Sequence, residues 1–102
     1  MKELCFIIPY FGCFSNYFLL FLKTCCLNNN FDWLIFTDDN TNYIYPPNVH
    51  KISMTFFECQ KLVQSKFECN VQLRNPYKLC DLKPMYGYIF EEYINEYRYW
   101  GH

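Results

Sequence analysis

The sequence lacks a cluster of basic residues, a glycine-rich segment and a long apolar run. Its nine Lys and Arg are scattered over 102 residues and the net charge is −1, whereas binding to nucleic acid requires Lys and Arg gathered on one surface. The three glycines argue against a flexible linker. The apolar run at residues 17–22 ends at Lys23, far short of the about 20 residues that a membrane span needs. We therefore expect a folded protein that binds no nucleic acid and has no transmembrane segment.

Patterns of metal binding, disulfide formation and secretion are also missing. No two of the seven cysteines have C-x-x-C spacing, and neither histidine lies near a group of cysteines in the sequence, so the pattern of a zinc site is absent. Most of the cysteines lie in apolar runs, where a free cysteine acts as a small hydrophobic residue. The first apolar run ends early at Pro9, unlike the longer run of a signal peptide. We expect free thiols and a cytoplasmic location.

What the sequence has in excess is aromatic side chains. Hydrophobic residues make up 52% and aromatic residues 23% of the chain, so the composition supports a packed core. The length of 102 residues is enough for one small domain, and no linker or internal repeat divides it. We therefore treat residues 1–102 as a single domain.

Apolar runs that end at turn residues predict buried β-strands. Such runs occupy residues 4–8, 32–37 and 49–54, and the aromatic run at 97–100 has the character of the approach to another buried strand. Residues 67–73 fit either a short strand or an extended connection.

Two helices are predicted between these strands. Ser15 is placed to cap a helix over residues 17–27, whose apolar side chains predict burial almost all round. Thr55 and Glu58 have the spacing of a capping box, which starts a second helix that ends near Lys66.

The C-terminal third carries further helix signals. Asn75 followed by Pro76 is typical of a helix start, and residues 81–84 form a second such signal. Apolar residues then recur every three to four positions, which predicts one face of a helix. These residues are Leu82, Tyr86, Ile89, Tyr93 and Tyr97.

Strands that alternate with helices predict an α/β fold. We expect a Rossmann-like, mostly parallel sheet with flanking helices and right-handed crossovers. Because the sequence finishes on an aromatic run that enters the core, we also expect the domain to be incomplete.

Three segments are candidates for a binding site, since ligands of parallel α/β sheets bind beyond the carboxyl ends of the strands. They are residues 9–12, 37–40 and 77–84. A nucleotide needs a flat surface for its base, acceptors for its ribose hydroxyls and positive charge for its phosphates. Tyr10 and Phe11 are candidates for the flat surface, and Asp38 or Asp39 for the acceptors. Lys78 or Lys83 is the candidate for the positive charge.

Each of these residues also has a structural interpretation. Tyr10 and Phe11 fit the core of an aromatic-rich chain, and Asp38 with Asp39 fits a turn that ends a strand. Neighbouring side chains of an extended chain point to opposite sides, which favours one ribose-binding aspartate over a metal-binding pair. Asp81 fits a helix cap. No nucleophile motif, phosphate-binding glycine loop or zinc motif is present.

Four segments of the chain together resemble a known family. They are residues 7–12, 33–39, 76–84, and 86–87 taken with 100–102. In this order they resemble a family of bacterial glycosyltransferase-like proteins that occur with polysaccharide and capsule biosynthesis. That family is similar to the GT-A nucleotide-diphospho-sugar transferase superfamily, and the resemblance covers essentially the whole chain.

The resemblance implies a nucleotide sugar, most simply a UDP-sugar, as the ligand. It implies that residues 9–11 line the nucleoside pocket, that residues 37–39 meet the base or ribose, and that Asp81 and Lys83 face the donor sugar and diphosphate. The full set of implied binding residues is Pro9, Tyr10, Phe11, Thr37, Asp38, Asp39, Asp81 and Lys83.

The resemblance also implies a divalent metal, Mn²⁺ or Mg²⁺, in the full-length family. There an Asp-x-Asp motif follows the segment that matches residues 100–102, and the 102 residues end before it. We therefore expect the N-terminal, donor-binding half of a GT-A domain, without metal ligands and without transferase activity of its own. The larger enzyme is compatible with peripheral membrane contact.

Two alternatives come from other classes of protein. One is a self-contained small α/β domain whose exposed aromatic surface docks a partner, and the other is a truncated product without function. Loss of nucleotide affinity on substitution of Asp38 or Asp39 distinguishes a nucleotide site from an interaction domain.

Overall fold

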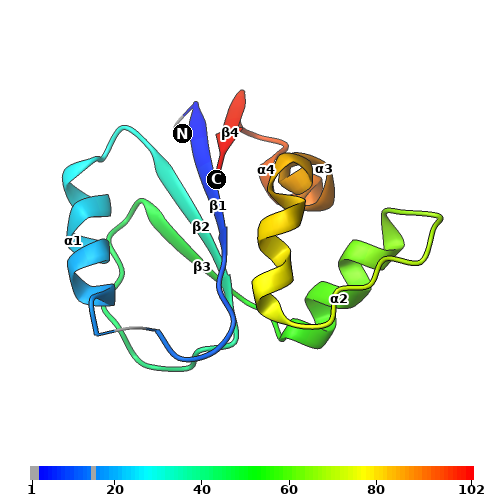
Figure 1. The fold of residues 1–102 in the computed structure, drawn as a ribbon. Helices are drawn as coiled ribbons and strands as arrows, with labels where there is room; N and C mark the ends of the chain where they lie inside the picture. The colour runs from blue at the N-terminus through cyan, green and yellow to red at the C-terminus, as the bar shows by residue number, and fades with distance from the viewer. Residues whose placement is uncertain (1–2, 15) are drawn as a thin grey trace.

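A four-stranded parallel sheet forms the centre of the molecule (Figure 1). The computed structural model describes residues 3–14 and 16–102. In it the strands β1 (Leu4–Pro9), β2 (Asp32–Thr37), β3 (Val49–Ser53) and β4 (Tyr99–Gly101) lie in the order β3-β2-β1-β4. Each neighbouring pair is parallel, so the predicted α/β fold is confirmed.

β1 and β2 are the two inner strands, as their apolar runs predict. On one face of the pair, Ile7 and Phe36 are at most 1% exposed. On the other face Ile35 is equally buried. β2 buries side chains on both faces, which needs apolar residues at successive positions, whereas Phe6 and Ile8 on the second face of β1 are only partly buried.

Helix α1 (Phe18–Leu27) covers the face of the sheet that carries Ile35 (Figure 1). It buries Phe18, Leu22 and Cys25 but leaves Leu19 and Leu20 each 63% exposed. The prediction of burial almost all round is therefore wrong, because the helix has the sheet on one side and no described element on the other. The predicted cap at Ser15 lies outside the described residues.

Helix α2 (Phe56–Ser65) begins with the predicted capping box on the opposite side of the sheet (Figure 1). The Glu58 amide donates to the Thr55 hydroxyl, and the Thr55 amide donates to the Glu58 carboxylate, each over 3.1 Å. Cys59 and Val63 on its inner face are buried in the larger of the two core clusters. Residues 67–73 then form neither strand nor helix.

The predicted helix through residues 82–97 is replaced by three shorter elements. A 3₁₀ helix, η1 (Pro76–Met85), starts at the Asn75 cap and is followed by α3 (Tyr86–Ile89) and α4 (Glu91–Ile94). Pro84 has no amide hydrogen to donate, so an α-helix is disfavoured through it. None of the described helices has the length and apolar character required to cross the membrane.

Phe90 lies at the break between α3 and α4 and packs against the sheet. Phe90 is fully buried and stacks on Phe36 of β2 with ring centroids 4.4 Å apart. The predicted apolar face is partly retained, since Tyr86, Ile89 and Ile94 are buried. Tyr93 is 40% exposed.

β4 confirms the strand signal at the end of the sequence. Its Trp100 pairs with Cys5 of β1, and the amides of Arg98 and Tyr99 both donate to the Glu3 carbonyl over 3.0 Å. The indole ring of Trp100 packs directly onto Gly87 of α3. β4 is thus held by backbone pairing and by the packing of Trp100. The Trp100 ring lies so close to α3 that only a glycine fits at position 87.

This contact predicts that Gly87→Ala destabilises the protein. An added Cβ would lie 2.3 Å from atoms of the Trp100 ring, so the ring or α3 must move, and overpacking of this kind costs about 1–3 kcal/mol. Chemical denaturation followed by circular dichroism measures the loss, with the exposed Glu96→Gln as the control. A Gly87→Ala protein as stable as the wild type would contradict this packing.

Candidate functional site

The strand order identifies one edge of the sheet as the place for a ligand. The chain runs outward from β1 through β2 to β3 and then returns to form β4 on the other side of β1. In open parallel sheets ligands bind at the carboxyl ends of the strands, close to the position where the order reverses. Here that position lies beside β1, so the loop that follows β1 is the first candidate.

The loops after β1 and β2 are joined at this edge by two aspartates. The Gly12 amide donates to the Asp38 carboxylate and the Phe14 amide donates to the Asp39 carboxylate, each over 2.9 Å. The sequence predicted that neighbouring carboxylates point to opposite sides. Both aspartates follow the end of β2 at Thr37, and both carboxylates instead reach the same loop.

The two aspartates differ in their surroundings. Asp38 is exposed, whereas Asp39 is only 8% exposed. Asp39 also accepts from the Thr41 amide over 2.7 Å. Hydrogen bonds from the Thr41 side chain and from the amides of Phe14 and Thr41 hold the pKa of Asp39 below its usual value, with a smaller contribution from the charge of Lys51. Asp39 is therefore held as a carboxylate at neutral pH.

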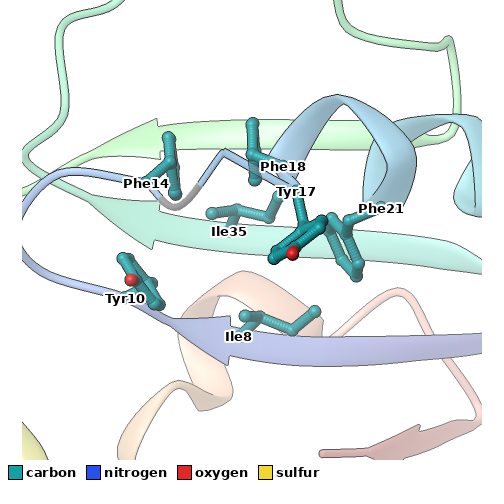
Figure 2. Close-up of a pocket in the computed structure, with 7 residues that line it drawn as sticks. All are labelled: Ile8, Tyr10, Phe14, Tyr17, Phe18, Phe21 and Ile35. Atoms are coloured by element: carbon teal, nitrogen blue, oxygen red, sulfur yellow. The ribbon is translucent and has the colours of Figure 1, made fainter.

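An aromatic groove opens beside this loop (Figure 2). Ile8 of β1 and Ile35 of β2 lie between two groups of rings, with Tyr10 and Phe14 on one side and Tyr17 and Phe21 on the other. Phe18 completes the lining of the groove. The groove has a volume of about 300 Å³, and this volume is at the lower limit for small-molecule sites.

The rings along one side of the groove are stacked. Phe14 lies parallel to Phe18 with centroids 3.7 Å apart, and Tyr10 stacks on Phe14 at 5.3 Å. Tyr10 is 43% exposed. The stack thus ends at a residue that is partly exposed to solvent.

A polar pocket is lined by other residues of the same loop. It has a volume of about 370 Å³ and joins the loop after β1 to the loop after β2. Its lining residues are Gly12, Cys13, Asp38, Asp39, Asn40 and Thr41. Residues 10–14 therefore contribute to both the aromatic groove and the polar pocket, a combination that suits a ligand with a flat ring and hydroxyl groups.

The predicted site residues of the first two segments have different environments. Tyr10 lines the groove and Asp38 lines the polar pocket. Phe11 instead packs against Phe56 at the start of α2, with centroids 5.5 Å apart. Thr37 is fully buried, and its hydroxyl accepts from the Asp39 amide. Pro9 is half-buried at the end of β1, paired with β2.

The third predicted segment is not joined to the other two. Asp81 and Lys83 are exposed on η1, drawn in yellow between α2 and α3 on the side of the sheet opposite α1 (Figure 1). Within the described residues no hydrogen bond or ion pair links either side chain to the loops after β1 and β2. The structure corrects the interpretation of Asp81 as a helix cap, because η1 begins at Pro76 and continues through it.

Gly12 lies in a predicted segment but was assigned no role, and the sequence analysis missed Phe14 and Phe18 of the groove and Cys13 and Thr41 of the polar pocket. Phe14 lies in the loop before α1, which begins at Phe18, so no local periodicity predicts their contact. Gly12 has a φ of +106°, which only a glycine adopts readily. A single glycine in a loop does not by itself predict this conformation.

The aspartates at this edge already accept hydrogen bonds from backbone amides. The acceptors are both carboxylate oxygens of Asp39 and one of Asp38. Among residues 3–14 and 16–102, no three His, Cys, Asp or Glu side chains are grouped as metal ligands. We therefore assign no metal-binding residue.

Comparison with known proteins identifies one match. A family model described as a family of unknown function, DUF6625, matches residues 6–102. No curated protein and no solved structure matches the chain. The matched region includes both loops of the candidate site.

The geometry of the loop predicts the effect of Gly12→Ala. No atom lies within 4 Å of the position that the new Cβ would take, so the expected loss of about 1–2 kcal/mol comes from the backbone conformation alone. Chemical denaturation measures it, and Gly12→Asn is the matched variant, since Asn tolerates positive φ better than Ala. Equal stability of the Gly and Ala proteins would contradict the described loop conformation.

Proposed function

The chain belongs to the DUF6625 family, and we propose that it binds a nucleotide sugar as the donor-binding part of a glycosyltransferase. The observation that carries the proposal is the position of the loop after β1. It lies at the carboxyl edge beside the reversal of the strand order, and its residues line both the aromatic groove and the polar pocket. The resemblance of the sequence to glycosyltransferase-like proteins supports the same ligand class.

In this proposal the base of the nucleotide stacks on Tyr10. The stack of Phe18, Phe14 and Tyr10 ends at Tyr10, which lines the groove and is 43% exposed, and nucleobases of any identity stack on aromatic side chains. Ile8 and Ile35 supply an apolar floor. This assigns the flat part of the ligand to the groove.

The ribose hydroxyls are assigned to Asp38. One of its carboxylate oxygens accepts from the Gly12 amide, and the other has no hydrogen bond within the described part of the chain. An exposed charged acceptor of this kind binds a hydroxyl donor strongly. The assignment of Asp81 and Lys83 to the donor sugar and diphosphate rests on the resemblance alone.

A divalent metal belongs to the proposal only as a component of the transfer step in the larger family. UDP binding by residues 1–102 is accordingly expected to be independent of Mn²⁺. The cytoplasm is the proposed location, because all seven cysteines are free thiols, and free thiols persist in a reducing compartment.

The exposed face of α1 favours a second candidate function. Leu19, Leu20 and Leu27 are 63–76% exposed on one ten-residue helix, and exposed apolar surface often marks a site of protein association. A small α/β interaction domain without catalytic activity would use this face to dock a partner.

Calorimetric titration with UDP, with and without Mn²⁺, tests the proposal. We expect weak binding that Tyr10→Ala reduces by about tenfold or more, since loss of one base–aromatic stack costs about 1–3 kcal/mol. Asp38→Asn should also weaken binding while retaining an acceptor for the Gly12 amide. Phe57→Ala is the matched control, because Phe57 is 61% exposed on α2 and away from the groove.

Absence of UDP binding by a folded monomer would overturn the nucleotide proposal and favour the interaction domain. An equal loss of affinity in Phe57→Ala and Tyr10→Ala would show that binding does not occur in the groove.

A further inference from the structure

Each carboxylate oxygen of Asp39 already accepts a hydrogen bond from the backbone of a loop. One carboxylate oxygen accepts from the Phe14 amide over 2.9 Å, and the other accepts from the Thr41 amide over 2.7 Å. Its own amide donates to the buried Thr37 hydroxyl over 3.1 Å. With 8% exposure, this carboxylate is poorly placed to bind a ligand hydroxyl.

The Phe14 amide is the point at which Asp39 acts on the groove. Phe14 is the middle ring of the stack, between Phe18 of α1 and Tyr10 at the end of β1. Its backbone is tied to β2 through Asp39, 25 residues away in the sequence. The position of one wall of the groove therefore depends on a carboxylate that lies outside the groove.

We propose that Asp39 is a positioning residue, which holds Phe14 and so keeps Tyr10 in place for stacking, while contact with the ligand falls to Asp38. This inference deepens the proposed function, and its ligand-dependent part rests on that proposal. It assigns different roles to two adjacent aspartates that the sequence presents as equivalent.

The direction of the pKa shift agrees with this role. A carboxyl group whose pKa is lowered in the folded state stabilises the native loop above its unfolded pKa, about 3.9 for aspartate, and this stabilisation is lost as the pH falls through the lowered folded pKa. Thr41, Phe14 and Lys51 are the groups that lower the pKa of Asp39. We therefore expect the Phe14 amide to stay protected from hydrogen exchange from pH 7 down to about pH 4 and to lose this protection at lower pH.

Amide hydrogen exchange followed by NMR, combined with UDP titration, tests the two roles in the whole chain. In Asp39→Asn the side-chain nitrogen cannot accept a hydrogen bond. The remaining side-chain oxygen keeps the local hydrogen bond from the Thr41 amide, so the Phe14 amide loses its acceptor. We expect exchange at Phe14 to rise about tenfold or more, as for loss of a hydrogen bond to a charged acceptor, with weaker UDP binding. Asp38→Asn should weaken UDP binding and leave the Phe14 amide protected.

The Ile35 amide in β2 is the internal reference, since it reports opening of the sheet rather than of the loop. Continued protection of the Phe14 amide in Asp39→Asn, or unchanged UDP affinity in that variant, would overturn the positioning role. If Asp39→Asn does not fold, acid titration of the wild type decides. If the NMR chemical shift of the Phe14 amide changes with pH at a pKa below the usual value of an aspartate, the positioning role is supported. If this chemical shift does not change with pH, the role is refuted.

Failure of the proposed function gives a different result. If the wild type binds no UDP while Asp39→Asn still exposes the Phe14 amide, the nucleotide proposal fails and the structural link from Asp39 to the groove stands. If UDP binds and the Phe14 amide is unaffected by Asp39→Asn, the nucleotide proposal stands and the positioning role fails.

Discussion

The parallel pairing of β1 with β2 is the constraint on which the rest of the structure depends. The register runs from Cys5 opposite Asp32 to Pro9 opposite Phe36, so the two strands end at the same level. The loops that follow therefore leave the sheet side by side, and residues 25 and 26 positions apart come within hydrogen-bond distance. A shift of this register by one residue would turn every side chain of one strand to the other face and would separate the two loops.

The two faces of the sheet are covered unequally, and this difference creates the groove. On one face α2, η1, α3 and α4 enclose the larger core cluster around Phe36 and Phe90. On the other, α1 packs mainly over β2 and β3, and Ile8 of β1 remains only partly buried. The candidate site is thus located where a central strand lacks a helix above its carboxyl end.

Local signals in the sequence predicted the elements that depend on neighbouring residues alone. The capping box at Thr55 and Glu58 and the Asn75 cap are formed as expected, because their partners are three residues away. The continuous helix through residues 82–97 was wrong, since Pro84 interrupts it and the packing of Phe90 against Phe36 selects a break that no local pattern contains. The burial of α1 was overestimated because apolar character does not reveal how many neighbours a helix has.

The sequence by itself determined the α/β class, the inner strands and the aromatic and acidic character of the loops after β1 and β2. Apolar runs and turn residues are local properties, and the carboxyl ends of parallel strands meet at one edge whatever the details of the loops. The tertiary structure alone decided that Tyr10 faces the groove while Phe11 enters the core. It also decided that Asp38 is open while Asp39 is bound by the backbone of Phe14 and Thr41. Adjacent residues of the same type are equivalent in a sequence, and they differ only once partners distant in the chain are brought beside one of them.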